Sequence, residues 1–139
     1  MSAAANMDYA LDASALLAVL LDEPGQDRVR AVLDRAFIHT VNIAEVIKKL
    51  LEKGVPLEEA RAAVDELHLG IQEEFRFDQA VGCGILLAET REYGFGLGDC
   101  ICLTAAADAG ATAVTAERLW QRLSGQSIQG RLIRIELIR

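Results

Sequence analysis

The sequence has 139 residues, of which 52% are hydrophobic and 25% are charged; this suits one domain with its own core and excludes a disordered tail or a low-complexity polymer. Lys and Arg number 14 against 21 Asp and Glu, and the resulting net charge of −7 argues against a protein that coats nucleic acid through a broad basic face. An enzyme whose acids hold metal ions that then contact phosphates is still compatible with this charge.

The N-terminus gives no sign of a membrane or export segment. Residues 1–6 are interpreted as an unstructured leader of a single domain over residues 1–139. The apolar run 13–21 is too short to span a bilayer, and no basic segment precedes it. We therefore expect a soluble cytoplasmic protein without membrane contact, in which the unpaired Cys83, Cys100 and Cys102 are reduced, small core residues.

Predicted strands alternate with predicted helices along the chain. The strands are predicted over 9–12, 37–41, 71–77, 112–115 and 132–138. The helices are predicted over 13–21, 26–36, 43–53, 56–69, 78–93, 99–109 and 116–123. This order predicts an α/β fold whose central, mostly parallel sheet carries helices on both faces.

Polar and glycine residues mark several helix boundaries. Asn42 and Asp78 are predicted N-caps, while Gly70 is predicted to end the helix that Pro56 opens. Two glycines at 82 and 84 fall inside a predicted helix, where each costs about 1 kcal/mol relative to Ala. We expect them to allow close helix packing.

Four acidic residues follow predicted strands or open predicted helices. Asp12 ends the first strand, Glu45 lies in the first turn of the helix after the second, and Glu117 follows strand 112–115. Asp99 opens a helix behind a glycine-rich loop. Each acid taken alone also fits a helix cap or the positive end of a helix dipole, and Asn42 with Glu45 fits a capping box.

Taken together, the four acids point to a metal site. The carboxyl ends of parallel strands meet at one edge of a sheet, where ligands bind in folds of this kind. Two carboxylates 4 Å apart repel by about 4 kcal/mol at an effective dielectric constant near 20. A divalent cation removes that repulsion, and oxygen ligands suit Mg²⁺ or Mn²⁺. The constellation therefore suggests metal-dependent phosphate chemistry.

The four acids lie in four sequence blocks: YALDASALL at 9–17, TVNIAEV at 40–46, LGDCICL at 97–103 and VTAERLW at 114–120. Together these blocks resemble the PIN-domain family, and most of all its VapC-type toxin branch. The resemblance implies a three-layer α/β/α fold. It also implies an endoribonuclease dependent on Mg²⁺ or Mn²⁺, with RNA as substrate, that is neutralised by a small VapB-like antitoxin.

The resemblance also implies roles for individual residues. Asp12, Glu45 and Asp99 match the three best-kept acids of the family, with Asp12 and Asp99 as metal ligands. Glu117 matches the fourth, where the family more often has Asp; its longer arm leaves open whether it, like Glu45, binds the metal directly or through water.

Two hydroxyl residues, Ser14 and Thr115, match positions that the family places beside the acids, where they would orient a carboxylate or water. Helix capping for Ser14 and β-propensity for Thr115 are the structural alternatives. Arg118 and Arg122 are interpreted as a solvated surface pair and Trp120 as a core anchor.

Two other functions fit the same residues. A catalytically weak PIN-like binding module is favoured by the departure at Glu117, and a metal-dependent phosphatase or flap-type DNA nuclease would share the acids. The high apolar content, above all in helices 13–21 and 43–51, leads us to expect a homodimer or partner contact.

Overall fold

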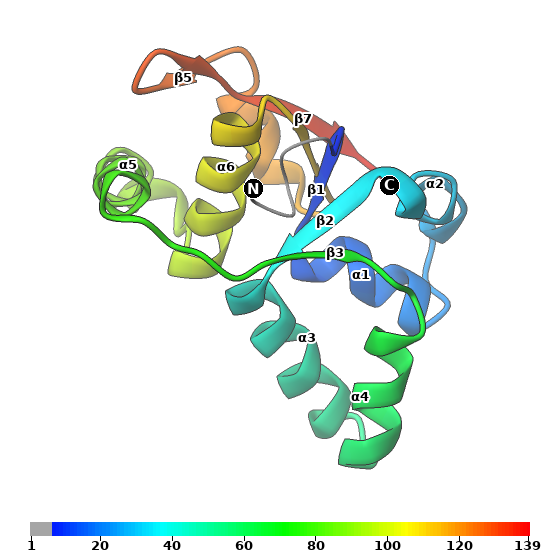
Figure 1. Cartoon of the computed structure of the whole chain (residues 1–139). Helices are drawn as coiled ribbons and strands as arrows, with labels where there is room; N and C mark the ends of the chain where they lie inside the picture. The colour runs from blue at the N-terminus through cyan, green and yellow to red at the C-terminus, as the bar shows by residue number, and fades with distance from the viewer. Residues whose placement is uncertain (1–6) are drawn as a thin grey trace.

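A computed structural model describes residues 7–139 and shows one five-stranded sheet between two layers of helices (Figure 1). The strand order is β3-β2-β1-β4-β7, and every neighbouring pair is parallel. The five strands are β1 (Tyr9–Leu11), β2 (Ala36–His39), β3 (Gly70–Gln72), β4 (Thr112–Thr115) and β7 (Arg134–Leu137). The predicted α/β class is confirmed.

The helices follow the order predicted from the sequence. The α-helices are α1 (Ala13–Leu20), α2 (Gln26–Arg30), α3 (Thr40–Glu52), α4 (Leu57–Asp65), α5 (Phe77–Glu89) and α6 (Leu97–Ala109). The 3-10 helices are η1 (Leu33–Arg35), η2 (Arg91–Tyr93) and η3 (Arg118–Leu123). A separate antiparallel hairpin consists of β5 (Ser127–Ile128) and β6 (Arg131–Leu132).

Each central strand sends alternate side chains to opposite faces of the sheet, as strand geometry requires. Leu11 and Ile38 pack under α1, α2, α3 and α4 in one core cluster. Ala10 and Phe37 pack against α6 in the other, which also includes the fully buried Trp120. Trp120 is thus a core anchor as predicted, and the sheet is covered on both faces (Figure 1).

Two predicted elements are shorter than the sequence indicated. The predicted strand 71–77 is reduced to β3, because its neighbour β2 ends at His39, which pairs with Gln72, and residues beyond have no strand beside them. The predicted helix 26–36 breaks after Arg30, since Ala36 enters the sheet opposite Tyr9. The apolar spacing of this segment therefore predicted which residues are buried, but it did not show that they belong to one continuous helix.

Several predicted boundaries also shift. The helix opened by Pro56 ends at Asp65, and Gly70 begins β3 instead. The predicted helix 116–123 is the 3-10 helix η3, and the predicted strand 132–138 divides between the hairpin and β7. The predicted leader 1–6 lies outside the described residues.

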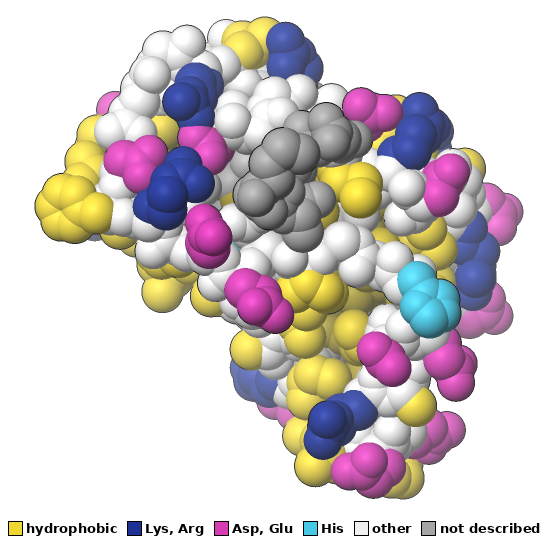
Figure 2. Space-filling view, in the orientation of Figure 1, with side chains coloured by type: hydrophobic (Ala, Val, Ile, Leu, Met, Phe, Trp, Pro, Cys, Tyr) yellow, Lys and Arg dark blue, Asp and Glu magenta, His cyan; other side chains and the backbone are white. Residues whose placement is uncertain are grey.

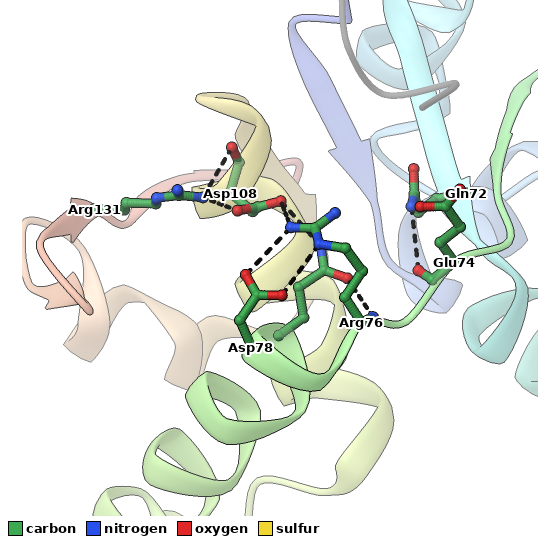
Figure 3. Close-up of polar contacts among 7 residues, drawn as sticks. Gln72, Glu74, Arg76, Asp78, Asp108 and Arg131 are labelled. Carbon is green, nitrogen blue, oxygen red and sulfur yellow. Dashed lines mark hydrogen bonds and ion pairs between the residues drawn. The ribbon is translucent and has the colours of Figure 1, made fainter. Parts of the chain in front are cut away.

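An ionic cluster joins the N-terminus of α5 to the C-terminus of α6 and to the hairpin (Figure 3). Asp108 of α6 accepts from Arg76 Nη2 at 2.9 Å and from Gln79 Nε2 at 3.0 Å, and it pairs with Arg131. Asp78 is not the N-cap that the sequence predicted: the cap is Arg76, whose backbone N–H donates to Gln79 Oε1. Asp78 instead pairs with the Arg76 side chain.

The three cysteines are buried free thiols, as predicted. Burial raises the pKa of each thiol, that of Cys100 to about 11, so all three stay protonated at neutral pH. Between residues 7 and 139, no helix is long and apolar enough to cross a membrane.

Candidate active site

Asp12 lies where β1 ends and α1 begins, and both oxygens of its carboxylate accept hydrogen bonds from the protein. Oδ1 accepts the Ala15 N–H at 2.8 Å, so Asp12 is the N-cap of α1. Ser14 Oγ donates to the same carboxylate at 2.8 Å, and Thr115 Oγ1 donates to Oδ2 at 2.6 Å. Asp12 is only 4% exposed, and desolvation raises its pKa to about 7 despite these hydrogen bonds.

Ser14 and Thr115 connect Asp12 to the turn after β4. Ser14 Oγ accepts the Ala116 N–H at 2.9 Å, and Thr115 Oγ1 accepts the Glu117 N–H at 2.9 Å. Ser14 is therefore not the cap of α1, which was the structural alternative for it. Each hydroxyl accepts from the backbone of one segment and donates to the carboxylate of another, and this fixes β1 against β4.

Glu45 lies in the second turn of α3 and projects from an exposed position. Its partner is Asn42, whose buried Nδ2 donates to Glu45 Oε1 at 2.8 Å and to the Gly98 carbonyl at 3.0 Å. The predicted capping box is wrong: α3 begins at Thr40, and His39 Nδ1 accepts the Val41 N–H as the cap. Because α3 starts three residues earlier than expected, Asn42 lies inside the helix, and its side chain is buried and connects Glu45 to α6.

Asp99 is the third residue of α6 and not its cap, which is Gly96. Its Oδ2 accepts the Gly96 N–H at 2.9 Å, and this closes the first turn of the helix. Partial burial raises the pKa of Asp99 above its ordinary value. The negative charge of Asp99 is a further, smaller cause of the raised pKa of Asp12.

Glu117 follows β4 and precedes η3, with an exposed side chain that makes no capping hydrogen bond. All four predicted acids nevertheless line one cavity of about 190 Å³, which α1, α3, α6 and the β4–η3 turn enclose. Its lining is Asp12, Ala13, Ser14, Leu17, Glu45, Lys49, Asp99 and Glu117. The structure thus brings the four acids together, whereas Arg118 and Arg122 lie outside the lining and Arg122 sits over the Tyr93 ring.

Sequence reasoning missed Lys49, Asn42 and Gly98 as parts of this site. Lys49 is the one cation in the lining, and its position one helical turn after Glu45 is the signal that identifies it. The roles of Asn42 and Gly98 depend on the approach of α3 to α6, which no local pattern encodes.

The carboxylate oxygens fit a hard divalent cation by their chemistry, because Mg²⁺ and Mn²⁺ prefer oxygen ligands. The burial of Asp12 beside Asp99 is the observation that supports this fit, since a cation there would offset both desolvation and repulsion. Within residues 7–139, however, no three His, Cys, Asp or Glu side chains are already grouped closely enough to hold a metal ion. The four acids line one cavity, in which Asp12, Glu45 and Asp99 each accept hydrogen bonds from the protein.

Comparison with protein families gives a match to the PIN domain over residues 9–126. The chain belongs to the PIN domain family. This match includes all four acids that line the cavity. No curated protein matches the chain in sequence.

Solved structures resemble this PIN domain along nearly its whole length. VapBC2 from Rickettsia felis, bound to a DNA fragment from the promoter, has a TM-score of 0.69 at 18% identity over 94% of this chain and 98% of the other. DNA-bound VapBC from Salmonella typhimurium has a TM-score of 0.69 at 22% identity, covering 96% and 99%. VapBC-1 from nontypeable Haemophilus influenzae has a TM-score of 0.68 at 18% identity, covering 95% and 98%. At these identities the likeness establishes the fold.

Proposed function

We propose that this PIN domain is a metal-dependent endoribonuclease and the toxin of a toxin–antitoxin pair. The observation that carries the proposal is the convergence of Asp12, Glu45, Asp99 and Glu117 from four segments on one small cavity. A buried Asp12 beside another acid is costly for folding, and such costs concentrate at functional sites. The four acids also lie, in order along the chain, within the sequence blocks that resemble the family, and all four fall inside the matched range 9–126.

In this proposal Asp12 and Asp99 hold Mg²⁺ or Mn²⁺, while Glu45 and Glu117 bind it directly or through water. The cation supplies activation of a water molecule and charge stabilisation at the scissile phosphate. Thr115 and Ser14 orient the Asp12 carboxylate, and Asn42 orients Glu45. The exposed Lys49 ammonium at the cavity edge is placed to meet an RNA phosphate.

A VapB-like antitoxin is the proposed partner, because the solved neighbours include VapBC complexes. A groove of about 790 Å³ between α3 and α4 supports this proposal. Figure 2 shows hydrophobic side chains in the hollow between these two helices, with charged side chains at its rim. Ile43 and Ile47 line it from α3, on the face of that helix that is turned away from Glu45. The proposal further includes a cytoplasmic location and a homodimer.

Cleavage of RNA by purified protein with millimolar Mg²⁺ or Mn²⁺ tests the function. Asp99→Asn should abolish cleavage with little change in melting temperature, because an Asn oxygen still accepts the Gly96 N–H. Unchanged cleavage by this variant would refute the assignment of Asp99. A wild-type protein that binds RNA without cutting it would instead establish the binding module, and cleavage confined to DNA flaps would establish the DNA nuclease.

A further inference from the structure

Three arginines on η2 and η3 have no carboxylate partner within residues 7–139. Arg91 lies on η2, Arg118 and Arg122 lie on η3, and all three are exposed. The ion pairs of the described chain all involve other lysines and arginines. In a chain with a net charge of −7, cations that no internal carboxylate neutralises are available to an anionic ligand.

The geometry of η3 determines how it presents its cations. Side chains three residues apart lie above one another in a 3-10 helix. Trp120 and Leu123 are such a pair, and both are buried in the core. The other positions therefore form two exposed flanks, with Arg118 on one and Arg122 on the other. Because Glu117 of the cavity immediately precedes η3, and this helix rises about 2 Å per residue, both arginines lie within about 10 Å of Glu117 along the backbone.

A series of ring contacts fixes Arg122 relative to the cavity. Its Cζ atom lies over the Tyr93 ring, 5.1 Å from the ring centroid. Tyr93 packs edge-on against Phe95 with centroids 6.4 Å apart, and Phe95 stacks on Trp120 at 6.2 Å. Phe95 lies four positions before Asp99 of the cavity. The guanidinium is thus held in place in the free protein, and this reduces the entropy that it loses when it binds a ligand.

The contact with Tyr93 leaves much of the Arg122 guanidinium available. One face of the planar group covers the ring, while the side chain as a whole is exposed. Guanidinium N–H groups bind phosphate oxygens, and unpaired RNA bases stack on guanidinium planes. Leu119 occupies the same flank of η3 and is 49% exposed, so it adds apolar surface beside that plane. This flank therefore offers contacts for both a phosphate and a base.

We propose that η2 and η3 bind an unpaired RNA strand next to the scissile phosphate, with Arg91 and Arg118 holding phosphates and Arg122 holding a phosphate and a stacked base. This inference rests on the proposed nuclease function, which places the scissile phosphate in the acidic cavity. Lys49 adds a cation to the cavity lining from α3. The strand then meets positive charge on both α3 and η3, and this offsets its repulsion by a chain of net charge −7.

Fluorescence anisotropy with a short, labelled, single-stranded RNA tests the surface without requiring cleavage. In metal-free buffer the four acids are common to all variants, so ratios of affinity report on the arginines alone. The triple variant Arg91→Gln, Arg118→Gln and Arg122→Gln should bind about tenfold more weakly or worse at low salt. Each lost phosphate contact should reduce the slope of log affinity against log salt by about 0.7, which gives about 2 for the triple variant. Thermal unfolding checks that each variant is folded.

Two further variants separate position from charge and charge from stacking. Arg134→Gln is the matched control: Arg134 is exposed and without an ion pair in the described chain, but it pairs with Thr112 at the amino end of β4, whereas Glu117 follows the carboxyl end. This variant should bind RNA with the wild-type affinity and salt slope. Arg122→Lys keeps the charge but removes the planar group. Its affinity should fall about fivefold with an unchanged salt slope.

Steady-state cleavage with Mn²⁺ links this surface to the reaction. The triple variant should have a raised KM and a kcat close to that of the wild type, because its lost contacts lie outside the cavity. Wild-type affinity and slope in the triple variant, or an equal loss in Arg134→Gln, would overturn the surface even if the wild type cleaves RNA. Arginine-dependent binding without cleavage would instead refute the nuclease function and leave the surface standing. Equally tight binding of double-stranded RNA would overturn the stacked base.

Discussion

The carboxylate of Glu45 packs directly against the Cα atom of Gly98. A Cβ built on Gly98 would fall 2.5 Å from both Glu45 oxygens. Gly98 is in the first turn of α6 without a positive φ, so the close approach of Glu45, and not backbone strain, excludes a side chain there. The backbone of α6 thus supplies part of the surface against which the Glu45 carboxylate rests.

Gly98→Ala should therefore abolish or strongly reduce RNA cleavage while preserving the fold. The added methyl group displaces the exposed end of Glu45, and Ala is favoured over Gly in a helix by about 1 kcal/mol. Thermal unfolding and cleavage rates measure the two effects. Gly96→Ala is the control, since its Cβ would meet Asp99 at an ordinary 3.8 Å. Wild-type cleavage by Gly98→Ala would show that Glu45 is not held in its working position by this contact.

Thr115→Val should destabilise the protein mainly at high pH. The substitution keeps the shape but removes the 2.6 Å hydrogen bond to Asp12, which lowers the pKa of that carboxyl. This hydrogen bond stabilises the ionised form of the carboxylate. Its loss should therefore lower the free energy of unfolding by about 1.5–3 kcal/mol when Asp12 is charged, and by less when Asp12 is protonated. Denaturant unfolding at pH 5 and pH 8 measures the difference. An equal loss of stability at pH 5 and pH 8 would show that the Thr115 hydroxyl does not preferentially stabilise the ionised Asp12 carboxylate.

Asp12→Asn should raise the stability of the metal-free protein at pH 8 but not at pH 4. The folded protein holds the Asp12 proton up to a pKa of about 7, against 3.8 ordinarily, so it binds more protons than the unfolded chain between those values. Stability contributed by protonated Asp12 is therefore present at acid pH and lost as pH rises from about 4 to 7. The gain at pH 8 should be on the order of 4 kcal/mol, because each unit of pKa difference between the folded and unfolded states corresponds to about 1.4 kcal/mol. Asp34→Asn, at an exposed position, should show no such pH dependence.

Millimolar Mn²⁺ should raise the melting temperature of the wild type. A cation that binds only the folded state adds about 2.7 kcal/mol of stability at 100 times its dissociation constant. Asp12→Asn should gain much less, because it removes a proposed ligand together with the repulsion that the cation relieves. Calorimetry with and without Mn²⁺ decides the matter. No shift in the wild type would mean that the four acids do not form one metal site.

Much of this architecture was predictable from local sequence. Alternation of strands and helices specified a parallel sheet covered on both faces, because each strand buries residues such as Ala10 and Leu11 on opposite sides. The positions of Asp12 and Glu117 relative to their strands were sufficient to place them at one sheet edge. The burial of Trp120 also followed from residue type.

Only the tertiary structure decided how the acids are held. The sequence predicts Asn42 as a cap, yet its side chain donates both to Glu45 and to the Gly98 carbonyl, 56 positions away from Asn42 along the chain. Such contacts depend on the distance between α3 and α6, which the packing of both helices on the sheet sets. The end of β3 likewise depends on where its neighbour β2 stops. Local periodicity reports which side of an element is buried, whereas contacts between distant segments arise only when the whole core packs.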